Sequence, residues 1–250
     1  MLLVVVHRPT LDDAAVARVA AATGLAMADV RSRLVGPTPR VLVVSQAAEP
    51  LHAMAAALVP LGLRTLVCDP ACAPTDEDRL VPRSLAFHPE ALVASDMTDT
   101  PHVCPWSAIG LIQHGMRSRV HVRVMKHKEA RFSLTRTLLS GGMATHRTVE
   151  VEQKLPRHDI ERFILLHRND GQDDVMLYER RLQYQFLDEA MQPSSYANLE
   201  VVLARIRERT TARLEERIAH PGFVTALPKT SVDPLDLALY LVQLGAAHEA

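Results

Sequence analysis

The stretch AATGLAMADVRSRLVG (Ala21–Gly36) decides how the first quarter of the chain folds. It predicts the end of one helix, a stop at Gly24, and a short second helix with Val30 and Leu34 on its apolar face. A second stop follows at Gly36. Glycine readily takes the left-handed conformation that ends helices. We therefore interpret Gly24 as a helix stop between packed helices, in preference to a catalytic elbow or a phosphate loop.

The segments on either side of this stretch complete a compact pattern. An apolar run at residues 2–7 and two shorter runs at 40–45 and 63–69 predict three strands. Helical spacing of apolar residues predicts a helix at 11–23, which Thr10 caps, and another at 48–62. The order β-α-α-β-α-β predicts a three-stranded antiparallel sheet with three helices on one face. We expect it to form a small domain over residues 1–70.

This order, with the phrase ATGL (Ala22–Leu25) closing the first helix, resembles the C-terminal domain of the bacterial ribosomal stalk protein over residues 1–69. The resemblance implies the βααβαβ fold. That family recruits translational GTPases through lysines on and near its second helix. The matching stretch here has only Arg31 and Arg33 as basic residues, so the resemblance extends to the fold and not to factor binding.

The rest of the chain changes to strand-like patterns after a Pro- and Asp-rich segment at 71–82, which predicts a linker. A hairpin turning at 88–90, several further strands and an amphipathic helix at 195–208 follow. This order, with the phrase Trp-Ser-Ala-Ile (Trp106–Ile109), resembles bacterial pleckstrin-homology and GRAM-like domains. The resemblance implies a mostly antiparallel β-barrel closed by a C-terminal helix over residues 83–212. The apolar spacing of Leu235, Leu239 and Val242 predicts a helix in the remaining extension at 213–250. The expected fold class is α+β.

The amino-acid composition and the N-terminal sequence indicate the compartment in which the protein is expected. The chain has 250 residues, 48% of them hydrophobic, and a net charge of -1, which gives no global attraction to nucleic acid or membrane. Its three cysteines lack the spacing of a disulfide framework. The N-terminus lacks a signal-peptide pattern, and no apolar run reaches the roughly 20 residues of a membrane span. We expect a cytoplasmic protein.

Charge is uneven along the chain. Residues 117–147 hold eight Lys and Arg against one acid, Glu129. Such a span attracts phosphates, a nucleic-acid backbone, acidic lipid headgroups or an acidic protein, although a solvated strand face is an equally open interpretation. Alternation along an extended strand places Arg117, Arg119 and Arg123 on one face with His121, and a loop is expected to follow. The predicted anion-binding residues are Arg117, Arg119, His121, Arg123, Lys126, Lys128 and Arg131.

Catalytic and metal motifs are missing from the sequence. The 12 histidines show no HxxxH or HExxH spacing, there is no paired CxxC, and no G-x-S-x-G occurs. His102 and Cys104 lie two apart on a predicted strand without a third group to orient them. We expect no catalytic residue, metal or cofactor. Our first hypothesis is a non-enzymatic binding or adaptor protein of unknown ligand. The alternative is an enzyme with a histidine-containing site at the domain interface.

Overall fold

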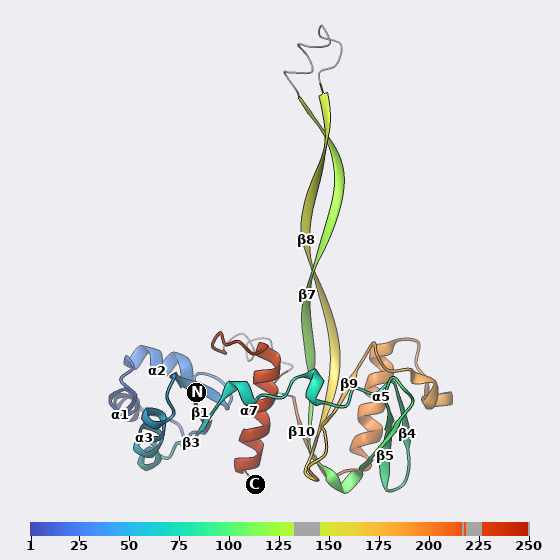
Figure 1. Cartoon of the computed structure of the whole chain (residues 1–250). Coiled ribbons are helices and arrows are strands. Elements are labelled where there is room, and N and C mark those ends of the chain that lie inside the picture. Colours follow the sequence, from blue (N-terminus) through green and yellow to red (C-terminus); the bar gives the residue numbers. More distant parts are fainter. Residues whose placement is uncertain (133–145, 217, 219–226, 250) are drawn as a thin grey trace. The chain divides into compact units, whose positions relative to one another are not determined.

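The computed structural model describes the backbone of residues 1–132, 146–216, 218 and 227–249. Side chains are described over the same ranges except 119–159 and 249. Three sheets and several helices make this an α+β protein, as predicted (Figure 1). None of the helices in the described part of the chain is long and apolar enough to cross a membrane.

The first quarter of the chain has the predicted alternation of strands and helices. Its elements are β1 (Leu2–His7), α1 (Asp13–Thr23), α2 (Met27–Leu34), β2 (Arg40–Val44), α3 (Glu49–Leu58), the 3-10 turn η1 (Val59–Leu61) and β3 (Arg64–Cys68). The strand order is β2-β1-β3, and β1 is antiparallel to both neighbours. The predicted three-stranded antiparallel sheet is therefore confirmed.

Both ends of α1 show how local sequence sets this fold. Gly24 takes φ 71° and its N–H bonds the carbonyl of Ala20, so the predicted glycine stop is confirmed. The predicted cap at Thr10 is wrong, because Asp12 instead accepts a hydrogen bond from the N–H of Ala15 at 2.7 Å. A carboxylate is a strong N-cap and also favours the positive end of the helix.

Strand β1 is buried on both of its faces. Leu3 and Val5 pack in one cluster with residues of α1, α2 and α3, which confirms that these helices cover one face. Leu2 and Val4 pack on the other face against α7 (Pro234–Glu249), through residues that include Leu241. Burial on two faces explains why the strand is an unbroken apolar run without polar alternation.

The middle of the chain forms a second antiparallel sheet. It contains β4 (Ser84–Phe87), β5 (Ala91–Ser95) and β6 (Pro101–Pro105), in that order. The predicted hairpin between β4 and β5 is confirmed by their antiparallel pairing. The predicted amphipathic helix is also confirmed as α5 (Ser195–Arg207), with the Ser194 hydroxyl accepting from the N–H of Ala197.

The third sheet has the order β10-β7-β8-β9. Its members are β7 (Ile109–Phe132), β8 (His146–Arg168), β9 (Val175–Tyr178) and β10 (Arg213–Glu215). β7 and β8 run side by side in opposite directions (Figure 1). The sequence patterns predict several short strands here and a helical extension at 213–250. The structure joins the short strands into two long ones, and strand β10, which pairs with β7 in parallel, lies at the start of the predicted extension. The helix predicted within that extension is confirmed as α7.

No sheet among the described residues closes into a barrel, so the predicted pleckstrin-homology-like barrel is wrong. The reason lies at the sheet edges. β10 occupies the free edge of β7, and Leu80 forms a parallel bridge to Val175 of β9. β6 ends in the 3-10 turn η4 (Trp106–Ala108) and stays in the separate sheet with β5. The strands that a barrel would join therefore have other neighbours.

Helix α7 is shared by two sheets. On one side Leu237 and Leu241 pack against β1, and on the other Leu235 and Leu239 pack against Phe163 and its neighbours on β8 and β9. The opposite face of β8 and β9 packs on α5. The predicted linker at 71–82 contains the 3-10 turns η2 (Pro70–Cys72) and η3 (Asp76–Asp78), and its end is buried at Arg79.

By their contacts the residues divide into two compact units. One comprises 1–116 and 162–250, and the other comprises 117–161, which we call the ribbon. In the described part of the ribbon, the only elements are the outer portions of β7 and β8. Strands in globular proteins usually have about 3–10 residues, whereas β7 has 24.

Candidate functional site

All seven predicted anion-binding residues lie on β7, within the ribbon. Arg117 is half-buried, and for the other six the structure describes the backbone only. Lys126, Lys128 and Arg131 were expected in a loop, but β7 continues to Phe132. That expectation is wrong because the strand continues beyond Val124, the last of the alternating valines. The structure thus places the seven residues on one strand.

The sequence of the ribbon is basic on balance, with the positive charge concentrated in residues 117–147. Residues 117–161 contain ten Lys and Arg against five Asp and Glu. A net positive segment of this kind attracts polyanions, and the attraction weakens as salt is added. The ribbon therefore combines an extended backbone with an excess of positive charge.

A pocket of about 380 Å³ lies in the larger unit, at the residues of β7 and β8 that adjoin the ribbon in sequence. β7 contributes His114, β8 contributes Arg162, and α5 contributes Tyr196 and Glu200. Gly115 lies in the same wall, where a Cβ would come within 2.9 Å of the Phe163 ring. Glycine is needed there for the strand to pack against that ring.

The polar groups of this pocket form a loose ionic network. His114 Nε2 lies 3.7 Å from Glu200 Oε1, and its Nδ1 lies 3.9 Å from Glu216 Oε1. The Arg162 guanidinium lies 3.7 Å from the same Glu200 oxygen and stacks on the Tyr196 ring, 3.6 Å from its centroid. Tyr196 is 45% exposed, and the stacked guanidinium is a favourable contact for such a partly exposed ring.

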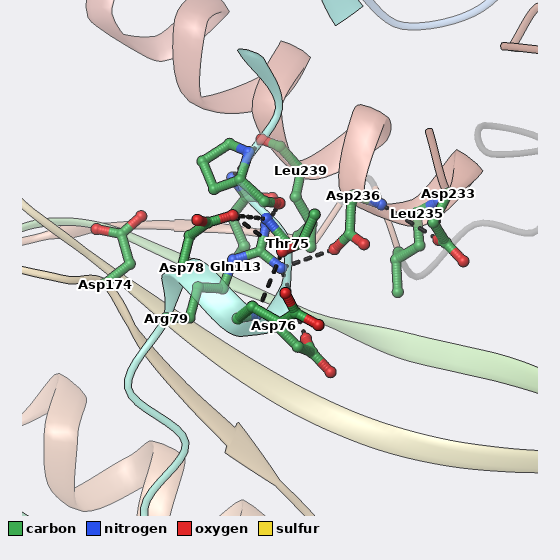
Figure 2. A network of polar contacts seen from close by, with 12 residues as sticks. Thr75, Asp76, Asp78, Arg79, Gln113, Asp174, Asp233, Leu235, Asp236 and Leu239 are labelled. Atoms are coloured by element: carbon green, nitrogen blue, oxygen red, sulfur yellow. Dashed lines mark hydrogen bonds and ion pairs between the residues drawn. The ribbon is translucent and has the colours of Figure 1, made fainter. Parts of the chain in front are cut away.

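A second polar network is buried between β7, β8, β9 and α7 (Figure 2). The Arg79 guanidinium lies 2.7 Å from Asp236 Oδ1, and it also donates to the carbonyl of Pro74 at 2.6 Å. The side chains of Arg79 and Asp236 are only 1% and 4% exposed, respectively. Asp76 accepts a hydrogen bond from the Tyr178 hydroxyl at 2.7 Å. These contacts hold the predicted linker, residues 71–82, against α7 and β9.

Gln113 connects this region to a histidine. Its Nε2 donates to the Leu239 carbonyl at 3.0 Å and lies 2.7 Å from His167 Nε2, which therefore accepts. The other ring nitrogen, Nδ1, donates to Asp174 at 2.6 Å. Histidine and aspartate form a buried pair, but the third member is an amide and not a nucleophile. The chain of contacts holds α7 in place, and we assign it a structural role.

The other candidates from the sequence have ordinary surroundings. His102 Nε2 lies 3.2 Å from Asp96, whose pKa is held well below its usual range by hydrogen bonds from Thr98, Thr100 and His102. Burial raises the pKa of the Cys104 thiol, which disfavours the reactive thiolate. In the described ranges, no group of three or more His, Cys, Asp or Glu side chains is arranged to hold a metal ion.

Comparisons with known proteins identify no family for this chain. No protein-family model, no curated protein and no solved structure matches the chain. The two resemblances stated from the sequence concern element order, and the stalk-protein resemblance stays a prediction.

Sequence reasoning missed most of the pocket and the buried network. The pocket residues come from elements that lie far apart in the chain, and no local spacing connects them. One signal was present for the network: Asp236 interrupts the otherwise apolar segment at 235–242. A lone carboxylate on an apolar helix face predicts a buried partner, because an uncompensated charge in the core is costly.

Proposed function

We propose that this chain is a non-enzymatic binding or adaptor protein that contacts an anionic partner through the basic residues of the ribbon. The observation that carries the proposal is the position of Arg117 and the six other predicted residues on β7, in a unit separate from the rest of the chain. The charge excess of that unit supplies the attraction. The partner is a nucleic acid, an acidic lipid surface or an acidic protein segment.

The stability of the ribbon also supports a partner. A two-stranded hairpin alone is marginally stable in water, because it lacks a third strand or a helix against which to bury its apolar side chains. The segment 120–124 contains three valines at alternate positions. Contact with a partner would stabilise the two strands while its charge is neutralised.

A cytoplasmic location belongs to the same proposal. All three cysteines are free thiols, which fits a reducing compartment. Cys68 and Cys104 are buried and Cys72 is exposed, and an exposed thiol is oxidised more readily in secreted surroundings.

The test is titration of the full chain with duplex DNA, heparin and anionic liposomes at two salt concentrations. The wild type should bind at least one of them at low salt, and each phosphate contact with DNA should steepen the dependence of log K on log salt by about one unit. Arg119→Ala/Arg123→Ala should weaken binding and reduce this slope. The matched control is Arg18→Ala/Arg207→Ala, which removes two exposed charges from helices outside the ribbon.

Two outcomes would contradict the proposal. One is the absence of binding to all three polyanions at low salt. The other is equal weakening by the ribbon variant and by the control variant, since binding would then depend on total charge and not on the ribbon.

The alternative function, an enzyme using histidines, has one observation in its favour. The pocket at His114 gathers an imidazole, two carboxylates and an arginine. Each of the carboxylate–histidine groups in the described ranges holds a single histidine, however, and a cleft that gathered several would support this alternative better. Turnover in a broad hydrolase and nuclease panel that is lost in His114→Ala would favour this alternative over the binding protein.

A further inference from the structure

The pocket of about 380 Å³ at His114 carries more negative than positive charge in its described lining. Its carboxylates are those of Glu200, on α5, and Glu216, directly after β10. Arg162 on β8 supplies the one guanidinium, and the imidazole of His114 adds no charge in its neutral form. All of these residues belong to the larger unit. With a neutral imidazole, the described lining therefore has one carboxylate more than it has cations.

The ion pairs of this pocket leave the carboxylate of Glu216 without a permanent cation. Arg162 lies 3.7 Å from Glu200 and stacks on the Tyr196 ring, so its charge is engaged within the wall. Glu216 lies 3.9 Å from His114 Nδ1, and among the described residues it forms no other ion pair or hydrogen bond. Hydrogen bonds from nitrogen to oxygen are about 2.7–3.2 Å long. The Glu216 oxygens thus keep their capacity to accept hydrogen bonds.

A neutral imidazole cannot satisfy both carboxylates of the pocket. Nε2 of His114 faces Glu200 at 3.7 Å, and Nδ1 faces Glu216 at 3.9 Å. The neutral ring has one N–H and one lone pair, so one of the two carboxylates must lie next to a lone pair. A positive charge on the ring or beside it removes this repulsion. A proton on His114 is one source of that charge, and a bound cation is the other.

The rest of the described lining offers partly exposed apolar surface. Met116 is 40% exposed and Tyr196 is 45% exposed. A flexible thioether and an aromatic ring both pack well against hydrocarbon. In the part of the chain whose side chains are described, no three metal-ligating residues are arranged to hold a metal ion. The pocket therefore suits an organic cation with an aliphatic stem better than it suits a metal ion.

We propose that this pocket binds a small aliphatic amine in its ammonium form. A primary ammonium carries three N–H donors and no acceptor, which matches the carboxylates of Glu216 and Glu200. Its stem packs along Met116 and Tyr196. The volume lies at the lower end of the roughly 300–1,000 Å³ typical of small-molecule sites. The site lies outside the ribbon and does not depend on the polyanion binding proposed above.

Calorimetric titration of the full chain with n-butylamine, at pH 8 in an amine-free buffer of low salt, tests the proposal. At this pH the amine is protonated and histidine side chains are largely neutral. We expect saturable binding of n-butylamine and no binding of 1-butanol, the uncharged control ligand. Glu216→Gln keeps the size of the side chain and removes its charge. It should weaken binding about tenfold, as expected for the loss of a hydrogen bond between charged groups.

The matched control variant is Glu208→Gln, a glutamate of similar exposure directly after α5 and outside the pocket lining. It should leave the affinity unchanged. Circular dichroism verifies that each variant is folded, and Glu200→Gln replaces Glu216→Gln if the latter is not. The proposal is overturned if n-butylamine shows no saturable binding, if 1-butanol binds as tightly, or if the pocket variant and the control variant weaken binding equally.

The pH dependence of binding is a readout that a merely structural role of these residues would not move. At about pH 5.5 a protonated His114 supplies the positive charge beside Glu200, Glu216 and Arg162, so the wild-type affinity for n-butylamine should fall between pH 8 and this pH. His114→Asn should show a smaller fall. An equal fall in both proteins would overturn the competition between proton and amine on which the proposal rests.

Discussion

Arg79 and Asp236 are the residues whose pairing most directly fastens α7 to the rest of the chain. Asp236→Ala should lower the free energy of unfolding by about 3 kcal/mol, because it removes the nearer of two carboxylates beside a buried guanidinium, the other being Asp76 at 3.7 Å. Among the described residues, Arg79 Nε has no hydrogen-bond partner, whereas its two terminal nitrogens contact Asp236 and the Pro74 carbonyl. Urea denaturation measures the loss. Asp13→Ala, which breaks the exposed pair with Arg31, should cost less than about 1 kcal/mol. Equal costs for the two variants would contradict the assignment.

The three cysteines should differ in reactivity because two of them are buried and one is exposed. Burial raises the pKa of the Cys68 thiol to about 11, and Cys104 is raised in the same direction. With Ellman's reagent at pH 8, we expect one fast-reacting thiol, the exposed Cys72, and reaction of the other two only on unfolding. Cys72→Ser should abolish the fast phase. A remaining fast phase in that variant would show that a buried thiol is accessible.

The raised pKa of Cys68 also predicts a pH dependence of stability. The folded protein keeps this thiol protonated up to about 11, whereas the unfolded chain ionises near pH 8.5. The unfolded state therefore binds fewer protons in this window, and stability should fall as pH rises through it. In urea denaturation at pH 8 and pH 10, Cys68→Ala should lose less stability between the two pH values than the wild type. An identical loss in both proteins would exclude Cys68 as the cause.

At the scale of elements, the sequence predicted correctly those helices and helix ends that depend on interactions between residues close in sequence. Gly24 and α5 were predicted correctly because a glycine stop, a serine cap and an apolar stripe act within a few residues. The extent of β7 and β8 was not predicted, because strand length depends on pairing between residues distant in sequence. Pro156 lies inside β8, where a proline normally argues against a strand. β9 pairs with β8 only at Phe163–Leu166, so Pro156 lies beyond that pairing.

Helix α7 is the element that unites two hydrophobic clusters. Leu241 packs against β1 and Leu239 against β8 and β9, and both are fully buried. Leu239→Ala and Leu241→Ala should each lower the free energy of unfolding by about 2–5 kcal/mol, from lost apolar burial and the cavity left behind. The control is Val35→Ala, a 66% exposed position, where the change should be within about 0.5 kcal/mol. If one of the two leucine variants is as stable as this control, α7 is not held on that side.

At the scale of the whole molecule, the division into two units predicts that they can be separated by mutation. Both β7 and β8 continue from the larger unit into the ribbon, and the four buried clusters seen where side chains are described lie in the larger unit. The sequence could not indicate this division, because the same two strands contribute to both units.

Replacing residues 117–161 by Asn-Gly tests this separation together with the proposed function. Met116 and Arg162 would then flank a two-residue turn of the type that joins antiparallel strands. We expect the shortened chain to keep a cooperative thermal transition, because its cores are intact, and to lose binding to DNA, heparin and liposomes. Retained polyanion binding would place that activity in the larger unit, whereas loss of the thermal transition would show that the ribbon is required for folding.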